Sequence, residues 1–206
     1  MSTRKALIII LSFLILGSTS IALAGLITKE HYPDGKLKIK WNYKNGKKDG
    51  ISKEDYESGK VYTEFNFKNG IKHGISKEYF KSGELKAEWK YKNGKLNGIS
   101  KAYNKKGQLL FEMNYKNNKM EGISKMFFDT GELKEETRFK NGIKEGITKG
   151  YYKSGKLKVE LNYKNGKLGG INKQYYENGK LKEESLYKDD KLISTKEYDE
   201  QGNLKK

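Results

Sequence analysis

A phrase of 24 residues repeats along this chain and limits what it can fold into. One copy, residues 74–97, reads GISKEYFKSGELKAEWKYKNGKLN. A glycine recurs at one phase of the phrase, at Gly35, Gly59, Gly83, Gly107, Gly131, Gly155 and Gly179. An aromatic column recurs at another phase, at Tyr43, Phe67, Tyr91, Tyr115, Phe139, Tyr163 and Tyr187. So short a period predicts one supersecondary unit stacked many times, with function on an extended surface rather than in a catalytic pocket.

Composition alone leaves a disordered chain open, because 34% of the 206 residues are hydrophobic and 33% are charged. The apolar residues sit at fixed phases, however, and 12% of the chain is aromatic, which favours a thin β-structure. Cysteine is absent, so disulfides, thiolate metal sites and lipid-modified cysteines are excluded. The net charge of +17 predicts attraction to anionic surfaces, although a lysine-rich exterior would also keep a long sheet soluble.

The first segment, residues 1–24, is predicted to be a secretory signal peptide. A basic pair at positions 4 and 5 precedes an apolar run, and Ala22-Leu23-Ala24 follows as a cleavage pattern. An uncleaved anchor is the alternative, because the weakly polar run reaches Ile27. Residues 27–30 align with residues 51–54, so the first repeat begins just after Ala24, and cleavage before Gly25 is favoured. We therefore expect an exported protein that is periplasmic, envelope-associated or secreted.

Each repeat reads as a hairpin with two strands and two turns. Ser82-Gly83 is a turn dipeptide, and Asn93-Gly94 is a strong hairpin signal that recurs at Asn45, Asn69, Asn141 and Asn165. If Ser82-Gly83 is a two-residue turn, Lys81 faces Glu84, and the same pairing joins Phe80 with Leu85, Lys77 with Glu88 and Gly74 with Tyr91. Because side chains alternate along a strand, one face then carries Phe80, Leu85, Ala87, Trp89 and Tyr91 with Gly74 and Ser76. The other face carries Ile75, Lys77, Tyr79 and Glu88.

This pairing predicts six cross-strand ion pairs, Lys53–Glu64, Lys77–Glu88, Lys101–Glu112, Lys125–Glu136, Lys149–Glu160 and Lys173–Glu184. We interpret them as structural pairs and not as acid/base dyads, because they recur in every repeat. The glycine before each isoleucine is expected to fit beneath the aromatic column. That column has a packing role or, alternatively, forms a ligand platform. The connection over residues 92–97 is either a tight turn that staggers the hairpins or a six-residue loop that stacks them level.

The phrase G-I-S-K-x-Y/F-x-x-x-G-x-L-K-x-E-x-x-Y-K-N-G-K resembles the bacterial variant of the MORN repeat over residues 26–190. The resemblance implies an all-β fold, an elongated, twisted single-layer antiparallel sheet of about seven stacked hairpins. It also implies a non-enzymatic module that binds proteins or membranes. Bacterial members are commonly labelled antitoxin components, a role that an export signal does not suit. Residues 191–206 are expected to form a degenerate C-terminal capping repeat, because the Asn-Gly pair becomes Asp189-Asp190 and the glycine spacing shortens.

Little in the sequence points to catalysis. Only His31 and His73 supply imidazole, they lie in different repeats, and neither has a metal-binding spacing. We therefore expect no enzyme activity, no cofactor and no small-molecule substrate. The predicted function is a scaffold that binds a protein or an anionic membrane surface, with an antitoxin-like inhibitor and a cell-wall or glycan binder as alternatives; nucleic acid is disfavoured by export. A row of lysines before the second turn is the predicted electrostatic rail: Lys44, Lys68, Lys92, Lys116, Lys140, Lys164 and Lys188.

Overall fold

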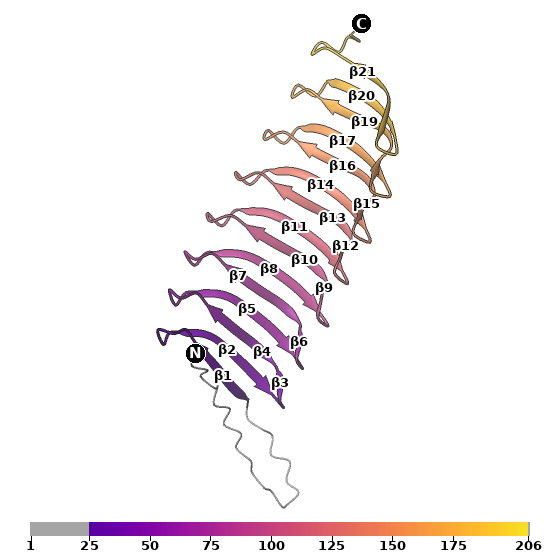
Figure 1. The fold of residues 1–206 in the computed structure, drawn as a ribbon. Helices are drawn as coiled ribbons and strands as arrows, with labels where there is room; N and C mark the ends of the chain where they lie inside the picture. Colours follow the sequence, from indigo (N-terminus) through magenta and orange to yellow (C-terminus); the bar gives the residue numbers. More distant parts are fainter. Residues whose placement is uncertain (1–24, 206) are drawn as a thin grey trace, which may run out of the picture.

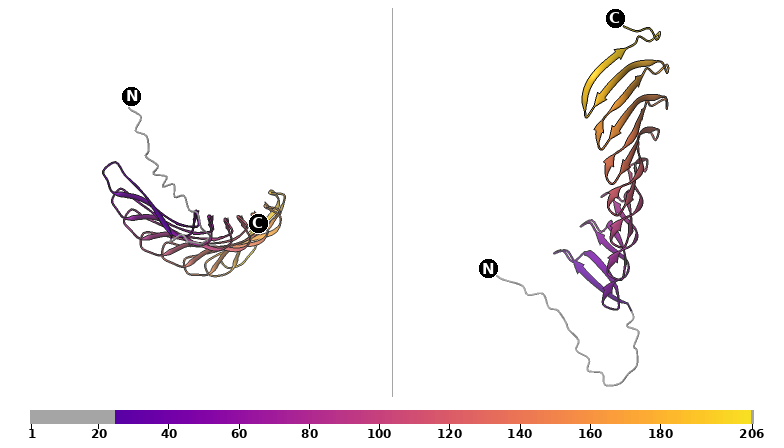
Figure 2. Two further views of the ribbon diagram at one scale, coloured as in Figure 1. Left: turned by 90° about the horizontal axis from the view of Figure 1, so that it is seen from below. Right: turned by 90° about the vertical axis from the view of Figure 1, so that its right-hand side faces the viewer.

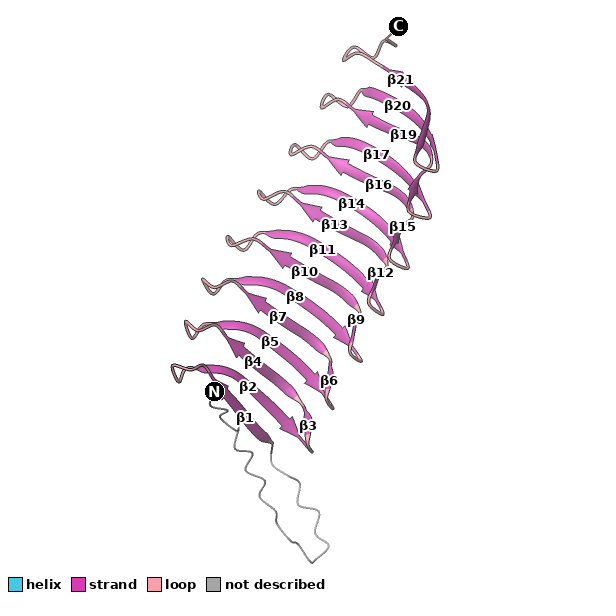
Figure 3. Cartoon of the chain, viewed as in Figure 1, coloured by secondary structure: helices cyan, strands magenta, loops and turns pink. Residues whose placement is uncertain are grey.

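The computed structural model describes residues 25–205, which form one open antiparallel sheet of 21 strands with no helix among them. Figure 1 shows the hairpins stacked into an elongated, twisted ribbon, and Figure 3 shows that strands and turns account for the described chain. The predicted fold is therefore confirmed. No described segment is a long apolar helix of the kind that crosses a membrane. The predicted signal peptide, residues 1–24, lies outside the described residues.

Each of the first six repeats contains a six-residue strand, an eight-residue strand and a two-residue strand, and in the seventh the seven-residue strand β21 (Lys191–Glu197) takes the place of the two-residue strand. The six-residue strands are β1 (Leu26–His31), β4 (Gly50–Asp55), β7 (Gly74–Tyr79), β10 (Gly98–Tyr103), β13 (Gly122–Phe127), β16 (Gly146–Tyr151) and β19 (Gly170–Tyr175). The eight-residue strands are β2 (Leu37–Lys44), β5 (Val61–Lys68), β8 (Leu85–Lys92), β11 (Leu109–Lys116), β14 (Leu133–Lys140), β17 (Leu157–Lys164) and β20 (Leu181–Lys188). The two-residue strands are β3 (Lys47–Lys48), β6 (Ile71–Lys72), β9 (Lys95–Leu96), β12 (Lys119–Met120), β15 (Ile143–Lys144) and β18 (Lys167–Leu168).

The first turn differs from the two-residue turn that we predicted. The amide of Gly83 donates to the carbonyl of Phe80 at 2.8 Å, and the amide of Phe80 donates to the carbonyl of Glu84 at 2.9 Å. Gly83 has a φ of 108°, so the turn spans residues 80–83 and is closed by a glycine. A bulge follows, and Leu85 pairs with Tyr79 instead of Phe80. The predicted pairings of Lys81 with Glu84 and of Phe80 with Leu85 are wrong, and Leu85 lies on the face of Tyr79.

Beyond the bulge the predicted register is correct. Gly74 pairs with Tyr91, Ser76 with Trp89 and Lys77 with Glu88. We call the two faces the serine face, which carries Ser76, Ala87, Trp89 and Tyr91, and the isoleucine face, which carries Ile75, Lys77 and Glu88.

The second connection combines a tight turn with a level stack. Asn93 and Gly94 have φ values of 51° and 78°, and Lys92 pairs with Lys95 across them. This is the turn that requires positive φ at both central residues and suits the twist of a hairpin. If the register of that turn continued along the strands, Glu88 would pair with Ile99. Glu88 instead pairs with Lys101, so the register shifts by two residues. The extra two residues are inserted around Gly98, so each residue lies in line with its counterpart 24 positions later.

The glycine before each isoleucine is needed for its backbone and not to make room for a ring. Gly98 has a φ of 99°, and Gly170 has a φ of 67°. A Cβ at Gly98 would lie 2.9 Å from Cδ of Lys90, on the opposite face from the aromatic column, and one at Gly170 would meet nothing within 4 Å. The interpretation that these glycines fit beneath the aromatics is therefore wrong. Their left-handed conformation produces the bulge that levels the stack.

The interior is thin and largely polar. Only Ile39 and Ala87 are buried hydrophobic residues in the described chain. The column with the lowest exposure to solvent consists of small polar residues, Ser52, Ser76, Ser100, Ser124, Thr148 and Asn172. The hydroxyl of Ser76 accepts a hydrogen bond from the amide of Asn66 at 3.2 Å, and Ser52, Ser100 and Ser124 repeat this bond. Serine is small enough to lie between aromatic rings, and its hydroxyl satisfies a backbone donor freed by the bulge.

The C-terminal segment continues the sheet with altered geometry. Strand β21 (Lys191–Glu197) pairs with β20, and its register shifts by one residue between Leu186 and Tyr187. Asp189 and Asp190 keep the positive φ of the Asn-Gly pair, at 49° and 67°. The side chain of Asp190 also accepts a hydrogen bond from the amide of Leu168 at 2.7 Å. The second turn therefore persists without glycine, because a short carboxylate tolerates the left-handed region.

Candidate interaction surface

Seven exposed lysines end the eight-residue strands along one edge of the sheet, at the positions of the predicted electrostatic rail. The structure adds a second row that sequence reasoning missed. Lys47, Lys95, Lys119, Lys167 and Lys191 lie directly opposite five of the seven across the second turn. We call the twelve residues the lysine edge. Like charges directly opposite each other destabilise a sheet, so this edge is not explained by stability.

A row of isoleucines runs beside the lysine edge on the same face. Ile27, Ile51, Ile75, Ile99, Ile123, Ile147 and Ile171 are 47–52% exposed. Their cross-strand partners are mostly polar, such as Asn66 for Ile51, Lys90 for Ile75 and Arg138 for Ile123. Lys92 is two residues from Lys90, and alternation therefore places the lysine edge and the isoleucine row on one face. Seven half-exposed β-branched side chains in line form an apolar strip beside a basic one.

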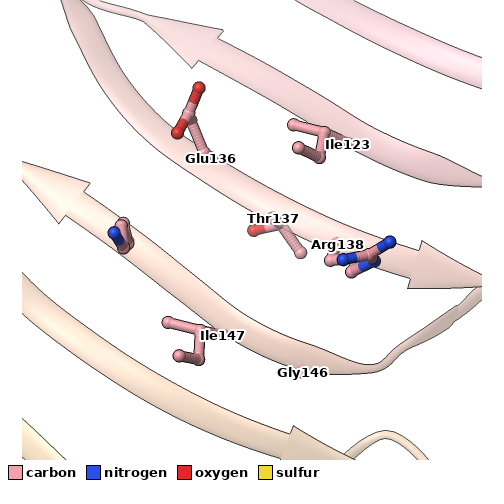
Figure 4. A pocket seen from close by; sticks show the side chains of 7 residues that line it. Ile123, Glu136, Thr137, Arg138, Gly146 and Ile147 are labelled. Carbon is pink, nitrogen blue, oxygen red and sulfur yellow. The ribbon is translucent and has the colours of Figure 1, made fainter.

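Figure 4 shows a hollow on this face. Its volume is about 430 Å³, and it lies between Ile123 and Ile147, on either side of the strand that carries Glu136, Thr137 and Arg138. Arg138 is exposed and occupies a phase where the other repeats have asparagine, lysine or leucine. The hollow therefore lies within the isoleucine row, and the guanidinium group of Arg138 forms part of its wall.

The third row of this face is a ladder of charges and tyrosines. All six predicted lysine–glutamate pairs are present, with nitrogen–oxygen distances from 2.6 Å for Lys53–Glu64 to 3.8 Å for Lys77–Glu88. The hydroxyl of Tyr79 donates to Glu64 at 3.1 Å, and Tyr103, Tyr151 and Tyr175 make the same contact in other repeats. Burial, together with the bond to Glu64, raises the pKa of Tyr79 to about 12.

These carboxylates have the properties of structural groups. Burial alone would raise the pKa of Glu64, but hydrogen bonds from Lys53 and Tyr79 outweigh it and lower the pKa. A carboxyl held ionised in this way is a poor general acid. The sequence interpretation of the pairs as structural therefore agrees with their geometry.

The serine face carries the aromatic column, each member of which pairs across the strand with a glycine or its equivalent, as Tyr91 does with Gly74. Aromatic rings are concentrated at the N-terminal end of this face. Trp41 stacks on Phe65 with ring centres 6.3 Å apart and packs edge-on against Phe67 at 6.2 Å. In the phase of Trp41, Phe65 and Trp89, the later repeats have Met113, Thr137, Leu161 and Ser185.

The two histidines are not brought together. His31 ends strand β1 near the first turn, whereas the amide of His73 donates to the carbonyl of Asn66 at 2.9 Å beside the second turn. Among residues 25–205, no group of three or more histidine, aspartate or glutamate side chains is placed to hold a metal ion.

A single-layer sheet of stacked hairpins, in which each surface residue recurs every 24 positions, is the architecture of a repeat protein. The model of the MORN repeat variant matches seven segments, residues 26–45, 48–69, 72–93, 96–117, 120–141, 144–165 and 168–189. The chain belongs to the MORN repeat variant family. The predicted resemblance is thus confirmed at the level of the family, and no comparison supports the antitoxin label.

A search of curated proteins finds no match for the chain. Among solved structures, one similar chain belongs to the crystal structure of a GtfA/B complex bound to UDP and GlcNAc. The sequence identity is 18%, the TM-score is 0.25, and the alignment covers 53% of this chain and 22% of that one.

Proposed function

We propose that this protein is a non-enzymatic scaffold that binds an anionic membrane surface through the isoleucine row and the lysine edge. The observation that carries the proposal is the adjacency of the two strips on one face of the sheet. MORN repeats are generally associated with protein or membrane binding, which supports a role of this kind. Repetition of the strip in every repeat supports an extended contact rather than a single pocket.

The energetics favour many weak contacts over one strong contact. Neighbouring repeats lie about 9.6 Å apart, which is close to the screening length of about 8 Å at physiological salt. Each lysine near an anionic leaflet contributes about 1 kcal/mol. Burying the exposed half of an isoleucine contributes about half of the 1.5–3 kcal/mol that full burial gives. A few repeats in contact would therefore hold the protein at the surface.

The twist of the sheet limits how many repeats touch a flat surface at once. Figure 2 shows that the strands fan around the long axis, so the isoleucine face turns along the array. Residues in neighbouring repeats should therefore act together, whereas residues at opposite ends should act independently.

The test is co-sedimentation of the protein with liposomes that carry anionic lipid and with neutral liposomes. We expect binding only to the anionic liposomes, and we expect it to be lost as salt is raised. A central cluster variant, Lys92→Gln, Lys95→Gln, Lys116→Gln and Lys119→Gln, should bind several-fold more weakly. The matched control removes four exposed lysines at or near the first turn, Lys81→Gln, Lys105→Gln, Lys106→Gln and Lys156→Gln, and should bind like the unaltered protein.

Equal binding to neutral and anionic liposomes, or equal losses in the two variants, would contradict the membrane proposal. A protein partner would then be the better interpretation, and affinity capture from envelope extract would look for it. The antitoxin-like alternative stays a prediction, and a toxin retained in that capture would support it. Export also stays a prediction, which amino-terminal sequencing checks by finding Gly25 as the first residue.

A further inference from the structure

A hollow of about 370 Å³ opens on the serine face, opposite the proposed membrane strip. Phe65 and Trp89 line it, on the strands either side of the strand that carries Ser76. Strands two apart are separated by about 9.6 Å. One repeat earlier, Trp41 and Phe65 lie over Ser52 with ring centres only 6.3 Å apart. The ring of Phe65 is therefore stacked on Trp41, and a gap remains between Phe65 and Trp89.

The wall of this hollow holds an unpartnered buried hydroxyl. Thr63 is only 8% exposed, and its Oγ1 has no hydrogen-bond partner, the only buried side-chain atom of the described residues in this condition. Thr63 lines the hollow and pairs across the sheet with Glu54 on one side and Glu78 on the other. Buried hydroxyls are normally hydrogen-bonded, so an orphan in the wall of a cavity indicates a site for a polar ligand group.

The charges around the hollow balance. Glu54 and Glu78 supply two carboxylates, and the ammonium of Lys86 lies 2.6 Å from Glu78. Lys77 also lines the hollow, and its ammonium is paired with Glu88 at 3.8 Å. The ammonium of Lys72 lies 4.6 Å from the ring centre of Phe65 and 5.2 Å from that of Tyr91. Because the ammonium of Lys72 already lies over the rings of Phe65 and Tyr91, a cationic ligand is disfavoured. The near-neutral surroundings likewise give an anionic ligand little advantage.

We propose that this hollow binds a neutral pyranose ring of a carbohydrate, with one face of the sugar on Trp89 and with the ammonium of Lys72 between the sugar and Phe65. A pyranose is apolar on its faces and carries hydroxyls around its edge, which matches aromatic walls with polar groups at their base. Thr63 and the two carboxylates accept hydrogen bonds from the hydroxyls, and Thr63 and Lys72 also donate. The hollow is open to solvent, so a sugar within a chain fits as well as a free one. The site is single, because later repeats lack rings in the phase of Trp89.

The site is tested with full-length protein that carries Trp41→Phe, so that Trp89 is the sole tryptophan reporter. Tryptophan fluorescence is followed while methyl glucoside, methyl mannoside and methyl N-acetylglucosaminide are added, and then their trisaccharides. We expect at least one sugar to change the emission with an affinity of about 1 mM or better. A stronger response to the trisaccharide would assign a polysaccharide as the source of the ring, and equal responses would assign a free sugar.

Thr63→Val is the decisive variant, because it keeps the shape of the side chain and removes the orphan hydroxyl. We expect about a tenfold loss of sugar affinity while the urea midpoint is unchanged or raised, since no hydrogen bond within the protein is lost. Glu54→Gln should also weaken binding. No response to any sugar at about 50 mM, well above the expected dissociation constant, would overturn the proposal. It would equally be overturned if Thr63→Val bound the sugar unchanged.

Discussion

The bulge that brings successive hairpins level can be tested with two adjacent glycines, of which only one has a positive φ. A Cβ would meet nothing within 4 Å at Gly169 or at Gly170. Gly170 has a φ of 67°, whereas Gly169 is not in the positive region. Replacing each by alanine therefore separates the conformational requirement from any steric one.

The expected magnitudes follow from the backbone. An L-residue forced into the left-handed region loses about 1–2 kcal/mol, so Gly170→Ala should lower the free energy of unfolding by that amount. Gly169→Ala should be neutral or stabilising by about 0.4–1 kcal/mol, because alanine restricts the unfolded chain. For a chain of this size, each kcal/mol corresponds to a shift of about 2–4 °C in the melting temperature.

Urea and thermal unfolding followed by circular dichroism would measure both variants. Midpoints are the appropriate quantity, because a repeat array can unfold in parts. Equal effects of the two substitutions would refute the requirement for positive φ. If Tyr187→Leu made Gly170→Ala harmless, the ring opposite the glycine would be the constraint, and the packing interpretation that we rejected would be correct.

Three further predictions concern the two faces. A double-mutant cycle with Lys53→Met and Glu64→Gln should give a coupling of about 0.2–1 kcal/mol that falls with added salt, and zero coupling at low salt would remove the ladder from the account of stability. Because the fold raises the pKa of Tyr79 to about 12, its contribution to stability should be full below pH 10 and lost as the pH rises toward 12. Tyrosinate absorbance should show late ionisation, and Tyr79→Phe should remove one tyrosine from it, because burial also raises the pKa of Tyr103, Tyr151 and Tyr175. Tyr91→Ala should cost about 2–4 kcal/mol in a thermal melt; an unchanged melting temperature with lost partner binding would make the aromatic column a binding platform.

The sequence was sufficient where alternation alone decides the outcome. Lys77 and Glu88 face each other because a side chain can lie on only two faces, and one wrong residue of register would put Lys77 opposite Ala87 or Trp89. The turn at Gly83 was misjudged because a serine–glycine pair suits both a two-residue turn and a longer glycine-closed turn. The choice moved Leu85 to the other face, and no local pattern encodes it.

The surfaces were only partly predictable. The rail lysines were visible as a column, but their partners, such as Lys95 opposite Lys92, depended on the tight second turn that the sequence left open. The hollow beside Trp89 depends on the tilt of Phe65 toward Trp41, a choice between two neighbours that a repeating sequence does not distinguish. Gly98 could be recognised as special but not as the cause of the level stack, because its role appears only when β8 and β10 are paired.

The level stack has a consequence for how such a protein changes its size. Because each residue lies in line with its counterpart one period later, insertion or removal of a whole repeat leaves every remaining row continuous. Each added copy lengthens the array by about 9.6 Å. It also adds one isoleucine and one or two lysines to the proposed contact. The number of repeats would therefore set both the length of the array and the number of membrane contacts. A protein that binds through many weak contacts gains avidity when a 24-residue unit is duplicated, without any new kind of side chain.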